Sequence, residues 1–399
     1  MQDTTTAVAQ AAPTATVYDR LKRSPQWLMP LGIVLIGLAL FTESFEVFKF
    51  SYLVAYSFFL SLTLGSLFLV IIHHLVDACW SAPLRRVTEH LSTLVIWMAI
   101  FFIPIAVFAP SIYPWMELEA THPDHALEAK KAFLNKTFWY VRAVIYFAVW
   151  AFLAMRLRGF SVSQDKDGDP KWTKKAQFTA AYAIILFALS ITGAAIDWHK
   201  SLVHEWFSTM YGVYYFAGSV WVTLATLYLL QMVLSREGAP LHGVIGRRQL
   251  HSNGVLLFAF TVFYAYIAFS QYFIIWNANL PEETFWYALR EQGSWLGIGN
   301  LMIFGHFFAP FLTLLRIDIK LNPAIMTFIG VWAWLMHYLD MAFNIMPVVQ
   351  PEGFSVSLSV IGLFLTFAGL LISAFLKSLD STNPYPVKDP RLGEALRDG

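Results

Sequence analysis

Residues 193–220 read GAAIDWHKSLVHEWFSTMYGVYYFAGSV. An apolar run ends here, and the residues that follow include several ionisable side chains, namely Asp197, His199, Lys200, His204 and Glu205. Aromatic and small residues then resume for a second run that is long enough to cross a bilayer. Two membrane-spanning helices joined by a short polar loop have this pattern.

The composition of the whole chain agrees with a membrane protein. Of its 399 residues, 57% are hydrophobic and only 13% are charged, whereas a soluble domain carries roughly a quarter charged residues. A net charge of +1 and the lack of a basic tract argue against a nucleic-acid partner. The single cysteine, Cys79, excludes an internal disulfide, a CxxCH haem-attachment site and an iron–sulfur cluster held by this chain's own thiolates.

Windows of about 20 apolar residues predict an all-α, polytopic membrane protein with ten transmembrane helices. We expect a ten-helix transmembrane domain over residues 26–380, a disordered cytoplasmic tail over 1–25 and a second cytoplasmic tail over 381–399. The predicted helices lie near 27–42, 50–72, 91–110, 137–157, 177–196, 208–234, 254–276, 294–315, 323–345 and 355–377.

The distribution of basic residues predicts the orientation of the chain. Of its 27 Lys and Arg residues, twenty lie on the side of the two predicted tails and seven on the other side. Because basic residues concentrate in cytoplasmic loops, both termini are expected in the cytoplasm. The loop around Asp197 and Glu205 then faces outward, which in a bacterium is the periplasm.

Ionisable groups inside the predicted helices are functional candidates, since burying each costs about 2.5–3.5 kcal/mol on insertion scales. His337, Asp340 and Asn344 share one face of the ninth helix. Arg142 lies near the outer end of the fourth helix, and His306 lies near the middle of the eighth. An acid beside a histidine suits quinol oxidation, in which two hydroxyl protons must be accepted, and it also suits a proton path.

The candidate set for a proton path or a quinone pocket comprises Arg142, Asp197, His204, Tyr215, His306, His337 and Asp340. No residue is assigned as catalytic or as a metal ligand. Haem is not expected, because only His306 and His337 lie deep in the helices. Two plainer interpretations remain open. Asp340 and Arg142 could form a structural ion pair with each other or with other helices, and loop residues such as Lys200 and Glu205 could be solvated or lie at a subunit contact.

The polar stripe of the sixth helix, which includes Tyr215, Ser219 and Thr226, allows two interpretations. It could line a water-filled half-channel, or its hydroxyls could bond back to carbonyls of the preceding turn while its small residues pack against other helices. The polar residues at the inner ends of the second, third and eighth helices are expected to anchor these helices at the membrane boundary, and a proton entry there is the alternative. These residues are His73, His74, Asp77, Glu89, His90 and Arg316.

Three stretches carry a resemblance to a known family. They read AIDWHKSLVHEWFSTMYGVYYFAG, KAFLNKTFWYVRAVIYFAVW and FYAYIAFSQYFIIWNANLPEETFWYALR. They resemble the NrfD/PsrC-like integral membrane subunits of alternative complex III, a bacterial quinol:electron-acceptor oxidoreductase, and the chain is most similar to the shorter of that complex's two large integral subunits. The resemblance covers all ten predicted helices. The family often has Pro-His before WFST, where this chain has His204 and Glu205.

The resemblance implies a fold and a set of partners. It implies two four-helix bundles, helices 2–5 and 6–9, flanked by helices 1 and 10. It also implies an iron–sulfur subunit, multihaem cytochrome c subunits and a larger homologous membrane subunit, all in the bacterial inner membrane with its lipid. Haem and iron–sulfur clusters would then belong to partners. This chain would bind no covalent cofactor and would supply a proton path, with a quinone or menaquinone pocket near the periplasmic side as a further expectation.

Two other classes of function stay open at this point. The chain could be a non-catalytic membrane anchor that holds the cytochrome and iron–sulfur subunits. It could also be a secondary transporter, although such proteins usually have helices broken by Gly or Pro at mid-membrane. Gly305 and Pro310 in the eighth helix provide one such place.

Overall fold

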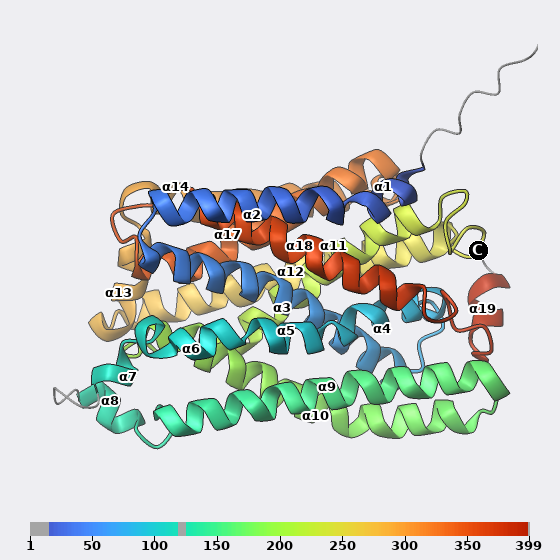
Figure 1. Ribbon diagram of the computed structural model, residues 1–399, viewed down its shortest axis with the longest axis horizontal. Helices are drawn as coiled ribbons and strands as arrows, with labels where there is room; N and C mark the ends of the chain where they lie inside the picture. Colours follow the sequence, from blue (N-terminus) through green and yellow to red (C-terminus); the bar gives the residue numbers. More distant parts are fainter. Residues whose placement is uncertain (1–15, 119–124, 398–399) are drawn as a thin grey trace, which may run out of the picture.

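The computed structural model describes residues 16–118 and 125–397 (Figure 1). The described part of the chain contains helices and no strands. Nine of its helices are long and apolar enough to cross a membrane, and a bent pair, Ala82–Phe101 with Ile103–Ile112, raises the number to ten if it is one span. The chain is therefore an all-helical, multi-pass membrane protein.

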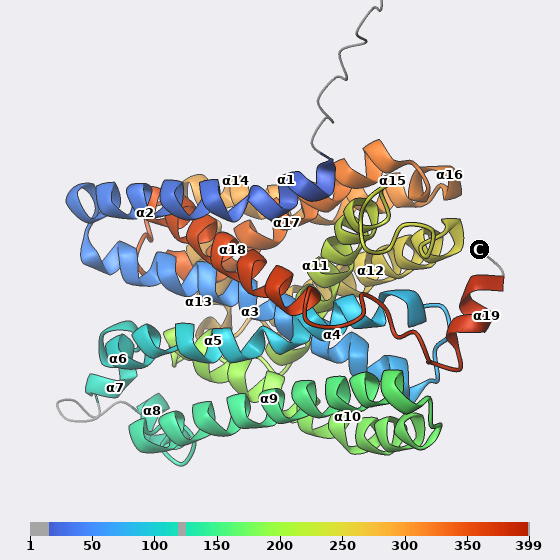
Figure 2. The same cartoon turned by 45° about the vertical axis from the view of Figure 1, so that its right-hand side comes forward.

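The long helices run along the long axis of the molecule (Figures 1 and 2). We call the end that carries α1 and α19 the terminal side, and the end that carries α7, α8 and α13 the opposite side. The principal helices are α1 (Val17–Arg23), α2 (Pro25–Thr42), α3 (Phe45–Leu75), α4 (Arg85–Thr93), α5 (Val95–Phe101), α6 (Ile103–Ile112), α7 (Trp115–Leu118), α8 (His125–Lys130), α9 (Lys136–Asp167), α10 (Lys171–Trp198), α11 (Tyr211–Leu234), α12 (Arg247–Ala278), α13 (Pro281–Arg290), α14 (Gly293–Leu301), the π-helical η3 (Met302–Phe308), α15 (Ala309–Leu314), α16 (Ile317–Lys320), α17 (Pro323–Ile345), α18 (Leu358–Leu379) and α19 (Leu392–Arg397).

The segment predicted as one helix over 91–110 is divided into α4, α5 and α6. The chain bends by 53° between Phe101 and Ile103. Pro104 follows at once, in the first turn of α6. Proline has no N–H for the helical hydrogen bond and its ring clashes with the preceding turn, so a bend at this point follows from the sequence.

Both predicted tails contain helices, which corrects the prediction of a disordered segment over 1–25 for its described residues. Thr16 and Asp19 form a capping box that begins α1, and such a cap satisfies two otherwise unpaired backbone N–H groups. Residues 1–15 lie outside the described part of the chain. In the C-terminal tail, α19 packs near the start of α4, and the Gln249 side chain donates to the Ala395 carbonyl at 2.9 Å.

Helix α3 lies at the centre of the packing. It contacts α4, α10, α11, α17 and α18, and most of its apolar stretch is buried, with 83% of the best 18-residue window inside the protein. Helices α3, α4, α9 and α10 contact one another in a ring, as do α11, α12, η3 and α17. Helix α2 packs along α18 (Figure 1). Lipid-facing helices such as α2 and α14 leave large apolar side chains exposed.

The helices α3 and α11 cross at close range. A Cβ atom on Gly65 would collide with the Ser219 carbonyl oxygen and the Thr223 hydroxyl of α11. The same two helices are joined by two hydrogen bonds, from Tyr215 Oη to the Ser57 carbonyl at 3.0 Å and from Thr223 Oγ1 to the Leu62 carbonyl at 3.1 Å. Small residues that let backbones approach are a usual device of membrane helix pairs.

We expect Gly65→Ala to lower the thermal unfolding midpoint of the purified protein, because overpacking at a tight contact costs about 1–3 kcal/mol. Gly37→Ala is the matched control, since a Cβ atom there meets nothing within 4 Å. Equal midpoints for the two variants, measured in the same detergent, would show that the α3–α11 crossing can relax without cost.

Candidate functional site

The first buried polar cluster joins α9 to α10 on the opposite side of the membrane domain. Arg142 donates from Nε to Asp197 Oδ2 at 2.7 Å and from Nη2 to Oδ1 at 2.6 Å. Tyr146 donates to the same carboxylate at 2.9 Å. Asp197 is fully buried and Arg142 is 6% exposed. A bidentate Arg–carboxylate pair is the strongest form of such a bond.

The remaining polar groups of this cluster are also bonded. Arg142 Nη1 donates to the Phe133 carbonyl at 2.9 Å, and its guanidinium lies 3.9 Å from the centre of the Phe133 ring. Trp139 donates to the Asp197 carbonyl at 3.0 Å. Arg142 therefore pairs with Asp197 and not with Asp340, and the plainer interpretation of a structural ion pair fits this cluster.

The second buried cluster lies where α11, α12 and α17 meet. Asp340 Oδ1 accepts hydrogen bonds from Tyr214 and, at 3.2 Å, from Asn344. Tyr214 also lies 2.9 Å from the Tyr264 hydroxyl. The other oxygen, Asp340 Oδ2, has no hydrogen-bond partner and lies 4.0 Å from His337 Nδ1.

His306 joins the same cluster from η3, the π-helical turn of its span. Its ring stacks on Trp221 and on Tyr264, each with a centroid separation of 4.0 Å. Neither of its ring nitrogens has a hydrogen-bond partner, although the residue is fully buried. π-helical turns within membrane or globular helices are frequent at functional sites.

His306, His337 and Asp340 thus present unpartnered atoms to one another. One ligand atom from each lies within 4.8 Å of the others, an arrangement that could hold a metal ion. The sequence predicted no metal ligand. Buried polar atoms are nearly always hydrogen-bonded, so a group of four unpartnered atoms at one place needs a chemical reason. A proton shared among the three side chains is the simplest one.

Helix α3 connects this cluster to the first one. Ser61 Oγ lies 2.8 Å from His337 Nε2, and Ser57 Oγ lies 2.8 Å from His199 Nε2. The two serines are one helical turn apart. His199 follows Asp197 by two residues and packs against the Tyr215 ring at 4.7 Å. The two histidines, one from each ring of helices, therefore contact the same face of α3.

Gly218 of α11 makes room for His337. A Cβ atom at this position would lie 2.8 Å from the imidazole Cε1 and 3.3 Å from Nδ1. The absence of a side chain at residue 218 therefore lets the imidazole reach Ser61 and face Asp340.

The remaining predicted residues have other surroundings. Tyr215 donates to the Ser57 carbonyl, so it fastens α11 to α3. His204 lies in the loop after α10, where its carbonyl accepts from Lys130 at 2.5 Å. It is not part of the Asp340 cluster. The Ser219 and Thr226 hydroxyls bond back to the carbonyls of Tyr215 and Val222, which favours packing over a half-channel for that stripe.

Several residues of the site were not predicted. Tyr214 was absent from the candidate set, and so were Ser57, Ser61 and His199. A signal for the serines was present in the sequence, since Ser57 and Ser61 stand four apart in an apolar run. Their partners could not be deduced, because His199 and His337 are distant in the chain. Arg290 was also missed; it donates to the carbonyls of Trp286, Phe343 and Asn344 at 2.8–2.9 Å.

A third polar cluster lies on the terminal side and includes Asp77 and Glu89, two of the residues expected at the membrane boundary. Arg85 pairs with Glu89 at 3.0 Å and with Asp389, and Arg86 pairs with Asp165 at 2.8 Å. Arg391 pairs with Asp389 at 2.9 Å and with Asp77 at 3.0 Å. The buried Arg85–Asp389 pair therefore holds the C-terminal tail to α4, and the partly exposed Arg391–Asp77 pair holds it to the end of α3.

The charge state of Asp389 follows from its buried position between two arginines. Burial alone would raise its pKa, but the Arg391 hydrogen bonds and the charges of Arg85 and Arg391 outweigh burial and hold the pKa well below its usual range. The carboxylate is therefore ionised in the folded protein throughout the neutral range.

No protein-family model matches the chain, and a search of curated proteins found no match.

The Arg142–Asp197 pair predicts a non-additive pattern of stability. We expect Arg142→Leu and Asp197→Leu each to lower the unfolding free energy by about 3–5 kcal/mol, because each leaves an uncompensated buried charge. The double variant should recover most of this loss, since an apolar pair of similar size is often neutral. Thermal unfolding of the four proteins measures the coupling. Losses that simply add would show that the two side chains do not act as a unit.

The Asp389 cluster predicts a pH dependence of stability. Because the folded pKa lies below the unfolded value of about 3.9, the carboxylate contributes stability that is complete above that value and is lost as the pH falls through the folded pKa. Asp389→Asn should therefore lower the unfolding midpoint at pH 7, and its difference from wild type should shrink below about pH 4. Asp318→Asn, in an exposed pair with Arg316, is the control. A constant difference across this range would contradict the assignment.

Proposed function

We propose that this chain conducts protons within the membrane domain of a quinol:electron-acceptor oxidoreductase. Its central group is the trio His306, His337 and Asp340. Two observations carry the proposal: four buried atoms of these side chains have no hydrogen-bond partner, and one ligand atom of each side chain lies within 4.8 Å of the others. An acid and two imidazoles in contact can accept, share and release a proton at neutral pH.

The surroundings of Asp340 suit repeated protonation. Oδ1 is held by Tyr214 and Asn344, so the carboxyl group keeps its position whether or not Oδ2 carries a proton. Oδ2 faces His337 Nδ1 at 4.0 Å, a distance that a proton crosses after a small rotation of either side chain or through one water molecule. Residues that are functional inside membranes commonly pair in this way.

A route from this trio toward the opposite side follows the serines of α3. His337 contacts Ser61, and Ser57 contacts His199, which lies next to the loop that begins after α10. Ser61 and Ser57 are one turn apart, which leaves one gap in the chain of hydrogen bonds. In this proposal the Arg142–Asp197 pair holds α9 and α10 in place beside the route, and protons do not pass through it.

The wider assignment rests on the family resemblance of the three stretches. We propose ten spans arranged as two four-helix bundles, helices 2–5 and 6–9, with the first and last spans alongside; the two rings of helix contacts and the α2–α18 pairing support this layout. The terminal side, rich in Lys and Arg, would be cytoplasmic in a bacterial inner membrane. Partners would be a larger homologous membrane subunit, an iron–sulfur subunit and multihaem cytochrome c subunits, which would hold the haem and iron–sulfur cofactors.

A quinone site on the opposite side is part of the same proposal. A cavity of about 310 Å³ lies there, lined by residues that include Phe133, Leu134, Ile196, Lys200 and Ser201. It lies next to the Arg142 cluster, because the Phe133 carbonyl that accepts from Arg142 belongs to its wall residues. Apolar walls with a few polar groups are typical of cofactor sites.

Replacement of the central acid tests the proposal. We expect Asp340→Asn to reduce quinol oxidation and the accompanying proton release by about 10²-fold, the usual contribution of a positioned acid or base. Asparagine can still accept from Tyr214, so the complex should assemble with its cofactors. The measurement is inhibitor-sensitive quinol oxidation by the purified complex, with its quinone, haem and iron–sulfur content determined in parallel.

Asp318→Asn is the control, because Asp318 lies outside the spans in an exposed ion pair. Ser61→Ala supplies a second variant, in which the acid remains and its link to α3 is lost; a slower rate of proton release is expected. If the Asp340→Asn complex assembles and turns over at the full rate, the proton-conducting role is refuted and the membrane-anchor alternative is supported. Loss of assembly in Asp340→Asn, together with full turnover of Ser61→Ala, would also refute the proton route.

A further inference from the structure

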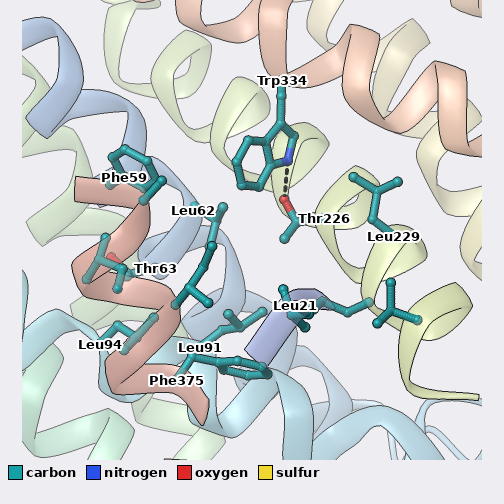
Figure 3. Close-up of a pocket in the computed structure, with 15 residues that line it drawn as sticks. Leu21, Phe59, Leu62, Thr63, Leu91, Leu94, Thr226, Leu229, Trp334 and Phe375 are labelled. Atoms are coloured by element: carbon teal, nitrogen blue, oxygen red, sulfur yellow. Dashed lines mark hydrogen bonds between the residues drawn. The ribbon is translucent and has the colours of Figure 1, made fainter. Parts of the chain in front are cut away.

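Figure 3 shows an apolar cavity of about 190 Å³ in close-up. Its wall residues from α11, and all but Ala368 of those from α18, belong to the halves of those helices that end on the terminal side. Its walls come from α3, α4, α11, α17 and α18, and Leu21 of α1 lies beside its mouth. The cavity is separate from the Asp340 cluster, and none of its wall residues belongs to that cluster.

The polar groups in the wall need no ligand. Trp334 Nε1 donates to Thr226 Oγ1 at 2.8 Å (Figure 3), Thr226 bonds back to the Val222 carbonyl, and Thr63 bonds back to the Leu60 carbonyl. The remaining wall residues are leucine, phenylalanine and other hydrocarbon side chains. An apolar cavity of about 150 Å³ stays dry and accepts a hydrocarbon guest, so this larger one suits a hydrocarbon chain.

The rim of the cavity faces the bilayer. Leu62 and Phe59 are buried in its interior, whereas Leu21, Leu230 and Ile372 are partly exposed. The rim is therefore formed by α1, α11 and α18. Because α1 lies at the terminal end of the molecule (Figure 1), a chain that enters here belongs to a lipid of the leaflet on that side.

Exposed cationic side chains lie on or next to the helices that form this mouth. Helix α1 is amphipathic; Leu21 turns toward the cavity, while its basic residues Arg20, Lys22 and Arg23 are exposed. Further exposed cations lie at the adjoining ends of α18 and α11, Lys377 and Arg236. The acids of these segments are fewer, Asp19, Glu237 and Asp380, and the Asp19 carboxylate is engaged in the cap of α1.

We propose that this cavity binds one acyl chain of an anionic phospholipid from the leaflet on the terminal side, with the phosphate against the basic face of α1. The cavity supplies the site for the chain. The cations supply the preference for a negative headgroup, since Lys and Arg side chains near a membrane surface attract anionic lipids. The occupant bridges α1 to α11 and α18, and so secures the N-terminal helix.

The test compares lipid retained by the full-length protein after purification in a mild detergent. Ala368→Phe places a ring in the cavity, because Ala368 is a buried wall residue. The matched control is Gly37→Phe, at a position of α2 where a Cβ atom meets nothing within 4 Å. We expect about one phospholipid per chain, by native mass spectrometry, in wild type and Gly37→Phe, and at least a tenfold loss in Ala368→Phe.

A charge variant and an add-back measurement complete the test. The combined substitution Arg20→Gln, Lys22→Gln and Arg23→Gln should keep the bound lipid but reduce its preference for phosphatidylglycerol over phosphatidylcholine about tenfold. Phosphatidylglycerol added to delipidated protein should raise the unfolding midpoint of wild type and not that of Ala368→Phe. The proposal is overturned if Ala368→Phe retains the lipid, if the midpoint of both proteins rises equally, or if the bound molecule is an isoprenoid quinone.

Discussion

The close crossing of α3 and α11 is the contact on which the rest of the structure depends. Gly65 permits it, and two hydrogen bonds to backbone carbonyls of α3 hold it. Because the two rings of helices share this crossing, residues from both can reach the same face of α3. His199 reaches Ser57, and His337 reaches Ser61. The contacts of His199 and His337 with α3 thus accompany the close packing of α3 and α11.

The three buried polar clusters differ in how their charged groups are paired. Buried atoms without a hydrogen-bond partner occur in two of them, around Asp340 and, at Asp165 Oδ1, on the terminal side. Arg142 and Asp197 satisfy each other and the backbone around them. The terminal-side cluster places acids between arginines and holds the C-terminal tail. Around Asp340 the atoms that face one another remain unpartnered. In a low-dielectric interior such unpartnered atoms are costly, and the proposed sharing of a proton among His306, His337 and Asp340 would provide them with partners.

Much of the fold could be predicted from the sequence, because a membrane span is a local property of about 20 apolar residues. Individual candidate residues could also be predicted, because ionisable side chains such as Arg142, His337 and Asp340 stand out in apolar stretches. Which residues pair is a tertiary property. Neither the bond between Arg142 and Asp197, 55 positions apart, nor the approach of His306 to Asp340 can be found from spacing alone.

Other features were missed for physical reasons of a different kind. Burying Ser57 and Ser61 in a membrane helix costs little free energy, because their hydroxyls can donate to carbonyls of the preceding turn. Their presence in the sequence therefore does not by itself indicate a functional site. The bend at Pro104 was within reach of sequence reasoning, but hydropathy averages over it. The ordered C-terminal tail could not be predicted from the sequence, because the Asp389–Arg85 pair joins residues that are 304 positions apart.

Infrared difference spectroscopy tests the central claim most directly, because it detects the protonated carboxyl group itself. The protein in lipid is taken through a pH change, and the carboxylic C=O band is compared in wild type, Asp340→Asn and Asp197→Asn. The account predicts a band that titrates in wild type and Asp197→Asn, shifts in D₂O, and is lost in Asp340→Asn. A titrating band that persists in Asp340→Asn, or none in wild type, would contradict a proton-accepting role for Asp340.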